Sequence, residues 1–190
     1  LSQQDWPDSQ ALPWVHTTCQ LGWHENRFFP YTTALQCDTE PEFQQLYQQF
    51  HTKGHWHQWF DLVEQLRQSQ HHVILRMTMA ASLSSVLLEP LGALPYVYHL
   101  WGRSGFGKTL SLMLAQSIWG NPANGALVRT LNMTNNAMAR TAAFLHHLPF
   151  AADELQQVEQ QWTDTNALIM QLTEGMDRSR AKAQGGIEAL

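Results

Sequence analysis

The stretch Gly102-Arg103-Ser104-Gly105-Phe106-Gly107-Lys108-Thr109 decides the fold class expected for this chain. Its spacing, G-x-x-x-x-G-K-[ST], is that of a phosphate-binding loop. The apolar residues 96–101 before it are predicted to form a short buried strand, and residues 110–119 after it carry apolar side chains at helical spacing. A strand, a glycine-rich loop and a helix in this order direct backbone N–H groups and the positive end of a helix dipole at one point. The sequence therefore predicts a polyphosphate site.

Each position of the loop has an expected role. Lys108 is expected to reach the β- and γ-phosphates of ATP, and the Thr109 hydroxyl is expected to hold Mg²⁺. The full set of residues expected to bind the nucleotide is Gly102, Arg103, Ser104, Gly105, Phe106, Gly107, Lys108, Thr109 and Leu110.

A second motif follows about 45 residues later, with one strand–helix unit between the two. Residues 150–154 read Phe-Ala-Ala-Asp-Glu, an apolar strand that ends in two adjacent carboxylates. Ligands of open α/β sheets bind at this end of the strands. We therefore expect Asp153 to be the second Mg²⁺ ligand and Glu154 to polarise the attacking water, so that Lys108, Asp153 and Glu154 are the candidate catalytic residues. An ordinary Asp-Glu helix start would look the same in isolation, and the position after the loop favours the catalytic interpretation.

Two further groups are candidates for sensing or neutralising the γ-phosphate. Asn132 and its neighbours end the intervening strand, although Thr134, Asn135 and Asn136 are equally well explained as helix caps. Arg178 and Arg180 lie in a basic segment near the end of the chain and are candidates for an arginine finger. The same segment could also be a solvated basic loop, or could contact nucleic-acid phosphates.

The composition limits the class of protein. At 190 residues and a net charge of −5, the chain is long enough for one sizeable core and is not strongly basic. Cys19 and Cys37 match no zinc or disulfide framework, so we expect two reduced thiols. No secretory signal or membrane-spanning segment is evident, which leads us to expect a cytoplasmic protein without a membrane partner. Several histidines invite a metal interpretation, but none has metal-ligand spacing, and surface positions are favoured for His51, His55, His57, His71 and His72.

Three regions are predicted along the chain. Residues 1–13 form a disordered tail, residues 14–94 an N-terminal extension of short strands followed by helices, and residues 95–190 the nucleotide-binding core. A hairpin is expected within residues 14–31. Helices are expected from Pro41 after a Thr39 cap, from His55, over residues 73–88 (buried beneath the sheet), after residue 134 and within residues 154–172; further strands are expected at residues 126–133 and 148–152. Alternating strands and helices predict a parallel α/β sheet sandwiched by helices.

The chain resembles a bacterial, prophage and plasmid family catalogued as domain of unknown function 927. The resemblance covers about residues 14–190. It is carried by Leu21-Gly22-Trp23, residues 79–91, residues 99–109, Ser117-Ile118-Trp119-Gly120, residues 132–136, Asp153-Glu154 and residues 175–180. The Trp-Gly pair is more specific to the family than the loop. Phe106 departs from the pattern, because similar chains usually have a small residue there.

The resemblance implies a helicase-like P-loop ATPase of the additional-strand type, dependent on Mg²⁺ and associated with phage or plasmid DNA replication. It implies ATP as ligand, DNA as a candidate partner and a ring-shaped homo-oligomer as a candidate assembly. A nucleotide-dependent switch or assembly module that translocates nothing is the alternative. A kinase-like transferase would need an arginine-rich lid and an acceptor pocket, and the sequence shows neither. Because the chain begins at Leu1, and no strand with a polar sensor follows Asp153-Glu154, we expect an incomplete ATPase core that binds nucleotide weakly or not at all.

Overall fold

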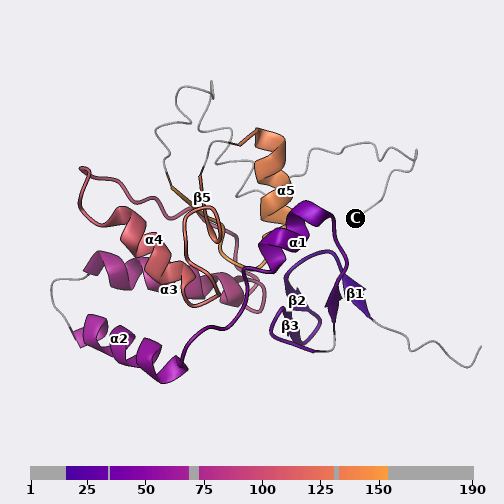
Figure 1. Cartoon of the computed structure of the whole chain (residues 1–190), viewed down its shortest axis with the longest axis horizontal. Coiled ribbons are helices and arrows are strands. Elements are labelled where there is room, and N and C mark those ends of the chain that lie inside the picture. Colours follow the sequence, from indigo (N-terminus) through magenta and orange to yellow (C-terminus); the bar gives the residue numbers. More distant parts are fainter. Residues whose placement is uncertain (1–15, 34, 69–72, 131–132, 154–190) are drawn as a thin grey trace, which may run out of the picture.

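A computed structural model of the chain describes residues 16–33, 35–68, 73–130 and 133–153 (Figure 1). Within these ranges the fold is mixed α/β, with five helices and three two-stranded sheets. Figure 1 shows α2, α3 and α4 gathered on one side of the molecule, and the N-terminal strands with α1 on the other. No helix in the described ranges is long and apolar enough to cross a membrane. The predicted tail at residues 1–13 and the helix predicted within residues 154–172 lie outside the described residues.

The N-terminal region contains the predicted hairpin. β2 (Gly22–His24) and β3 (Arg27–Phe29) pair antiparallel, with Gly22 opposite Phe29. β1 (Thr17–Thr18), which precedes the hairpin in sequence, pairs in parallel with β4 (Gln36–Cys37), which follows it. Both cysteines are free thiols, as expected.

Two helices follow, with boundaries close to those predicted. α1 spans Pro41–Tyr47 and places its proline in the first turn, but the predicted Thr39 cap is wrong, because the N-cap residue is Glu40 and no side chain caps the helix. α1 ends at Tyr47, where the amides of Gln49 and Phe50 bond to carbonyls three residues back and tighten the chain into a turn. α2 spans Trp56–Gln68.

The third helix, α3, spans Val73–Leu88 as predicted, but its expected burial beneath a sheet is wrong. It packs against α4 (Lys108–Gln116) instead, with Thr78, Met79 and Ser82 at the buried face. Its other face is exposed and includes Val73, Ile74, Met77, Leu83 and Leu87. An apolar sequence on all sides predicts that a helix is covered, whereas the described residues cover only one side of this one.

A strand–helix–strand unit completes the described chain. β5 (Val128–Thr130) and β6 (Ala151–Asp153) pair in parallel, with Thr130 opposite Asp153, and α5 (Asn135–Leu145) connects them. The Thr134 side chain accepts a hydrogen bond from the backbone N–H of Ala137, which confirms its expected role as a helix cap. Both strands are shorter than predicted.

The strand predicted at residues 96–101 is wrong. These residues form no strand, and Trp101 is 86% exposed. The apolar pattern suits a strand, but a strand also needs a neighbour for its backbone N–H and C=O groups. β5 and β6 pair with each other, and no described strand pairs with residues 96–101.

A single core joins the two ends of the described chain. Leu21 and Phe29 of the hairpin and Phe43 of α1 pack with Trp119 and Phe144. The remaining buried members of this cluster are Leu46, Leu127, Leu145 and Leu148. The extension and the predicted nucleotide-binding region therefore share their core, and the boundary at residue 94 stays a prediction.

Trp119 and Gly120 lie where four segments meet. The Trp119 indole N–H donates to Ser82 Oγ of α3 at 2.8 Å, and the Trp119 carbonyl accepts from the Tyr31 hydroxyl at 2.7 Å. A Cβ added to Gly120 would lie 2.1 Å from the Gln49 carbonyl oxygen, so only glycine fits. The adjoining Asn121 amide N–H donates to that same oxygen at 2.9 Å. These contacts explain why a tryptophan followed by a glycine is suited to this position.

We predict that Gly120→Ala lowers the free energy of unfolding by about 3 kcal/mol, at the upper end of the usual cost of overpacking. The methyl group would meet backbone atoms of Gln49 and Phe50 that cannot move separately. Gly92→Ala is the comparison: Gly92 has φ 58° with nothing within 4 Å of an added Cβ, so that change should cost about 1 kcal/mol. Urea unfolding of both variants measures the difference, and equal losses would contradict the close contact at Gly120.

Candidate phosphate-binding site

The loop at residues 102–107 has the backbone conformation that its glycines allow. Gly105 and Gly107 have φ values of 84° and 77°, in the left-handed region where a side chain would be strained. Gly107 is also the N-cap of α4, so α4 begins directly at Lys108. No atom outside the adjoining residues lies within 4 Å of where a Cβ would stand on either glycine. The loop therefore leaves open space at the N-terminus of a helix, where backbone N–H groups favour an anion.

Lys108 extends back over the loop. Its Nζ donates to the carbonyl oxygens of Gly102 at 2.9 Å and Arg103 at 3.0 Å. These neutral carbonyls are weaker partners for an ammonium group than a phosphate oxygen, because the phosphate adds the Coulomb attraction of an opposite charge. The lysine is thus held at the loop by contacts that an incoming anion could replace.

Thr109 and Asp153, the two predicted Mg²⁺ ligands, are brought together. The Thr109 hydroxyl donates to Asp153 Oδ2 at 2.5 Å across 44 residues of sequence. α4 packs against β6, and the contact joins the first turn of the helix to the last residue of the strand. A hydroxyl and a carboxylate oxygen are hard ligands of the kind that Mg²⁺ prefers, so this pair fits the metal.

Other loop residues face solvent. The Arg103 and Ser104 side chains are exposed, and Phe106 is 72% exposed. The departure from a small residue at position 106 therefore leaves a phenyl ring at the surface of the loop. Ser111, one turn into α4, donates its hydroxyl to the Gly107 carbonyl at 2.9 Å and fixes the start of the helix.

Four predicted site residues lie outside the described residues. They are Glu154, Asn132, Arg178 and Arg180. The proposed general base, sensor and arginine finger therefore stay predictions from sequence.

Three of the histidines for which surface positions were predicted lie within the described ranges. His51, His55 and His57 are exposed, and no group of three or more His, Cys, Asp or Glu in the described ranges could hold a metal ion. His71 and His72 lie outside these ranges.

A structural histidine that follows α5 was not predicted, because no local sequence pattern marks it. His147 Nδ1 accepts from the Trp23 backbone N–H at 3.0 Å, and its Nε2 lies 3.5 Å from Glu89 Oε2 at the end of α3. Gly22 is needed beside it, because a Cβ there would lie 2.7 Å from the His147 side chain. Burial, the largest effect, lowers the pKa of His147 below its ordinary value; His24 also lowers it, and Glu89 opposes the shift. Only the tertiary structure reveals this residue, because its partners are more than 50 positions away in sequence.

The comparisons with known proteins identify the family. The chain matches the family described as Domain of unknown function (DUF927) over residues 3–189. The chain belongs to this family, which confirms the predicted membership. No curated protein and no solved structure shows a significant match.

We predict that the stability of the protein falls as the pH is lowered below about 6.5, the ordinary histidine value. Because the folded-state pKa of His147 is lower than this, the unfolded chain binds a proton first, and the loss is complete once the pH passes below the folded pKa. Protonation at Nδ1 also removes the acceptor for Trp23 N–H. His147→Asn keeps an acceptor but does not titrate, so its urea unfolding between pH 7.5 and 5 should depend less on pH. His57→Asn, at an exposed position, is the control; an unchanged slope in His147→Asn would contradict the assignment.

Proposed function

We propose that this protein binds ATP with Mg²⁺ at the loop of residues 102–109 and hydrolyses it, as a P-loop ATPase. The observation that carries the proposal is the contact between Thr109 and Asp153 beside a glycine loop over which Lys108 extends. Helix packing alone does not require a hydroxyl and a carboxylate to meet at the mouth of such a loop. Together these groups supply donors for phosphate and oxygen ligands for a divalent cation in one place.

The proposed division of labour follows from the chemistry of each group. Lys108 and the loop N–H groups would bind the β- and γ-phosphates, while Thr109 and Asp153 would hold Mg²⁺. The bound cation would supply neutralisation of the charge that develops on the phosphate oxygens. Glu154, adjacent to Asp153 in sequence, is proposed as the base that orients water.

We predict that Lys108→Ala weakens ATP binding at least tenfold, because removal of charge-assisted hydrogen bonds costs about 1.5–3 kcal/mol and each 1.4 kcal/mol is tenfold. Isothermal titration with Mg-ATP measures the change in Kd. Lys53→Ala is the matched control, since Lys53 is exposed and lies outside the loop. Equal ATP affinity in the Lys108→Ala variant and the unaltered protein would contradict the proposal that ATP binds at this loop.

The proposed biological role is helicase-like, linked to phage or plasmid DNA replication, and it rests on the resemblance in motifs alone. The alternative, a nucleotide-dependent switch or assembly module, is favoured by one observation. Lys108 is bonded to the Gly102 and Arg103 carbonyls, so phosphate binding that draws its Nζ away from these oxygens would rearrange the loop. Such a rearrangement could signal the bound nucleotide without any translocation.

Single-stranded DNA distinguishes these two roles. If the protein is a motor on DNA, we predict that ATP hydrolysis rises several-fold on addition of single-stranded DNA and that the increase falls with salt, because phosphate contacts release counterions. A colorimetric phosphate assay at two salt concentrations measures this, with Lys108→Ala as the background. Hydrolysis at one rate with and without DNA, together with no DNA binding, would favour the switch.

A further inference from the structure

A groove beside the candidate phosphate site is lined, among the residues that the structure describes, by leucines. Its walls come from α2, α3 and α4, and we call it the leucine groove: Leu62, Leu66, Leu75, Leu110 and Leu114. Its volume is about 150 Å³, below the roughly 300–1,000 Å³ of pockets that hold a whole drug-sized ligand. Leu110 is 63% exposed and Leu62 is 45% exposed, so the groove is open to solvent.

The directions of the three helices place the groove next to the loop. The Trp59 indole N–H donates to Ser117 Oγ at the far end of α4, so α2 runs antiparallel to α4 and its C-terminal end approaches the start of α4. Ser82 Oγ donates to the Ala115 carbonyl, while Leu75 lines the groove with Leu110, so α3 runs in the same direction as α4. The groove therefore follows the half of α4 that begins at the phosphate loop.

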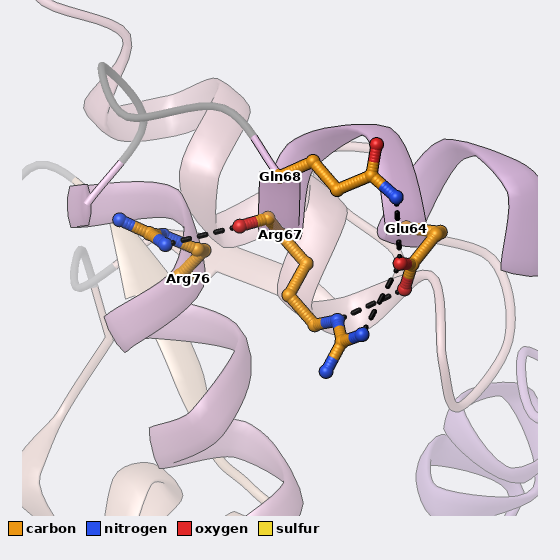
Figure 2. A network of polar contacts seen from close by, with 4 residues as sticks. All are labelled: Glu64, Arg67, Gln68 and Arg76. Atoms are coloured by element: carbon orange, nitrogen blue, oxygen red, sulfur yellow. Dashed lines mark hydrogen bonds and ion pairs between the residues drawn. The ribbon is translucent and has the colours of Figure 1, made fainter.

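A polar network fixes the end of α2 against α3. Figure 2 shows Glu64 bound by the Arg67 guanidinium and the Gln68 amide, and Arg76 of α3 donating to the Arg67 carbonyl at 3.1 Å. The last bond satisfies a carbonyl at the C-terminus of α2. Arg76 adjoins Leu75, so this network holds the helices that carry two walls of the groove.

We propose that the leucine groove receives the base of the nucleotide whose phosphates bind at residues 102–109. This inference rests on the proposed function and adds to it. Leu110 follows Thr109 directly, and Leu114 lies one helical turn further, so the leucines begin about 1.5 Å and extend to about 7.5 Å along the helix axis from Thr109. A base is tethered to its phosphates through the ribose and must lie close by.

The chemistry of the groove also defines the class of nucleotide. Leucine side chains bury a flat ring but offer no donor or acceptor to its edge. Discrimination between bases requires hydrogen bonds to the edge, because an analogue is rejected strongly when it leaves buried polar groups unpaired. With this described lining, we expect the groove to accept nucleoside triphosphates with little preference between adenine and guanine.

The test compares three ligands by isothermal titration: Mg-ATP, Mg-GTP and Mg-tripolyphosphate, which has no base. We expect ATP and GTP to bind within about threefold of each other and each at least tenfold more tightly than tripolyphosphate, because burial of the ring removes apolar surface from water. A preference of more than tenfold for one purine, or equal binding of ATP and tripolyphosphate, overturns the inference.

Two variants test the groove itself. Leu62→Ser removes apolar lining from a half-exposed position, and Leu62→Trp fills the groove; both should weaken ATP at least fivefold and leave tripolyphosphate unchanged. Leu87→Ser is the control, since Leu87 is an exposed leucine of α3 outside the groove. Thermal melting checks that each variant is folded. Unchanged ATP affinity in both Leu62 variants, or an altered oligomeric state in place of altered affinity, overturns the inference.

The failure of the proposed function gives a different result. If neither ATP nor tripolyphosphate binds, or if Lys108→Ala binds both as well as the unaltered protein, the phosphate site and the groove inference fail together. If Lys108→Ala weakens the binding of both ligands, but ATP binds the unaltered protein no more tightly than tripolyphosphate does, only the groove inference fails.

Discussion

The arrangement of the described residues depends on the contact between Trp119-Gly120 and the segments around it. The indole is 7% exposed and bonds to Ser82 of α3, while the absence of a Cβ on Gly120 lets the backbone at Gln49 approach. The Tyr31 hydroxyl donates to the Trp119 carbonyl, and desolvation raises the pKa of this hydroxyl above its ordinary value. One dipeptide therefore positions the hairpin, the end of α1 and α3 around the end of α4. Because the glycine-rich loop lies at the other end of α4, this contact also sets the position of the candidate site.

The candidate site combines a local feature with a long-range one. The glycine conformations of the loop and the start of α4 at Lys108 are local consequences of the sequence. The meeting of Thr109 and Asp153 instead needs α4 to pack against β6. The position of His147 likewise depends on contacts between distant segments, because it accepts a hydrogen bond from Trp23 of β2 and faces Glu89 at the end of α3. A change in the packing of α4 against β6 would alter the site without any change in the loop.

Much of the local structure could be predicted from the sequence. The bounds of α3, the proline at the start of α1 and the Thr134 cap follow from periodicity and capping preferences, which act within a few residues. Burial could not be predicted in the same way. An apolar pattern shows that α3 and residues 96–101 could be covered, but coverage depends on elements elsewhere in the chain, and the described residues leave both partly exposed. The pairing of Asp153 with Thr109 was predicted because the two motifs are recognisable separately, whereas His147 has no local pattern.

The sequence by itself determined the glycine-rich loop at residues 102–107, the order of most helices and strands, and membership in the family of unknown function, which matches residues 3–189. These depend on spacing and on short-range conformational preferences. Only the tertiary structure decided which residues from distant segments meet: Thr109 with Asp153, Trp119 with Ser82, His147 with Trp23, and the leucines of three helices beside the loop. The physical reason is that the faces of these helices and strands could pack in several ways. Which contacts form depends on the shapes and hydrogen-bonding groups of all the segments together.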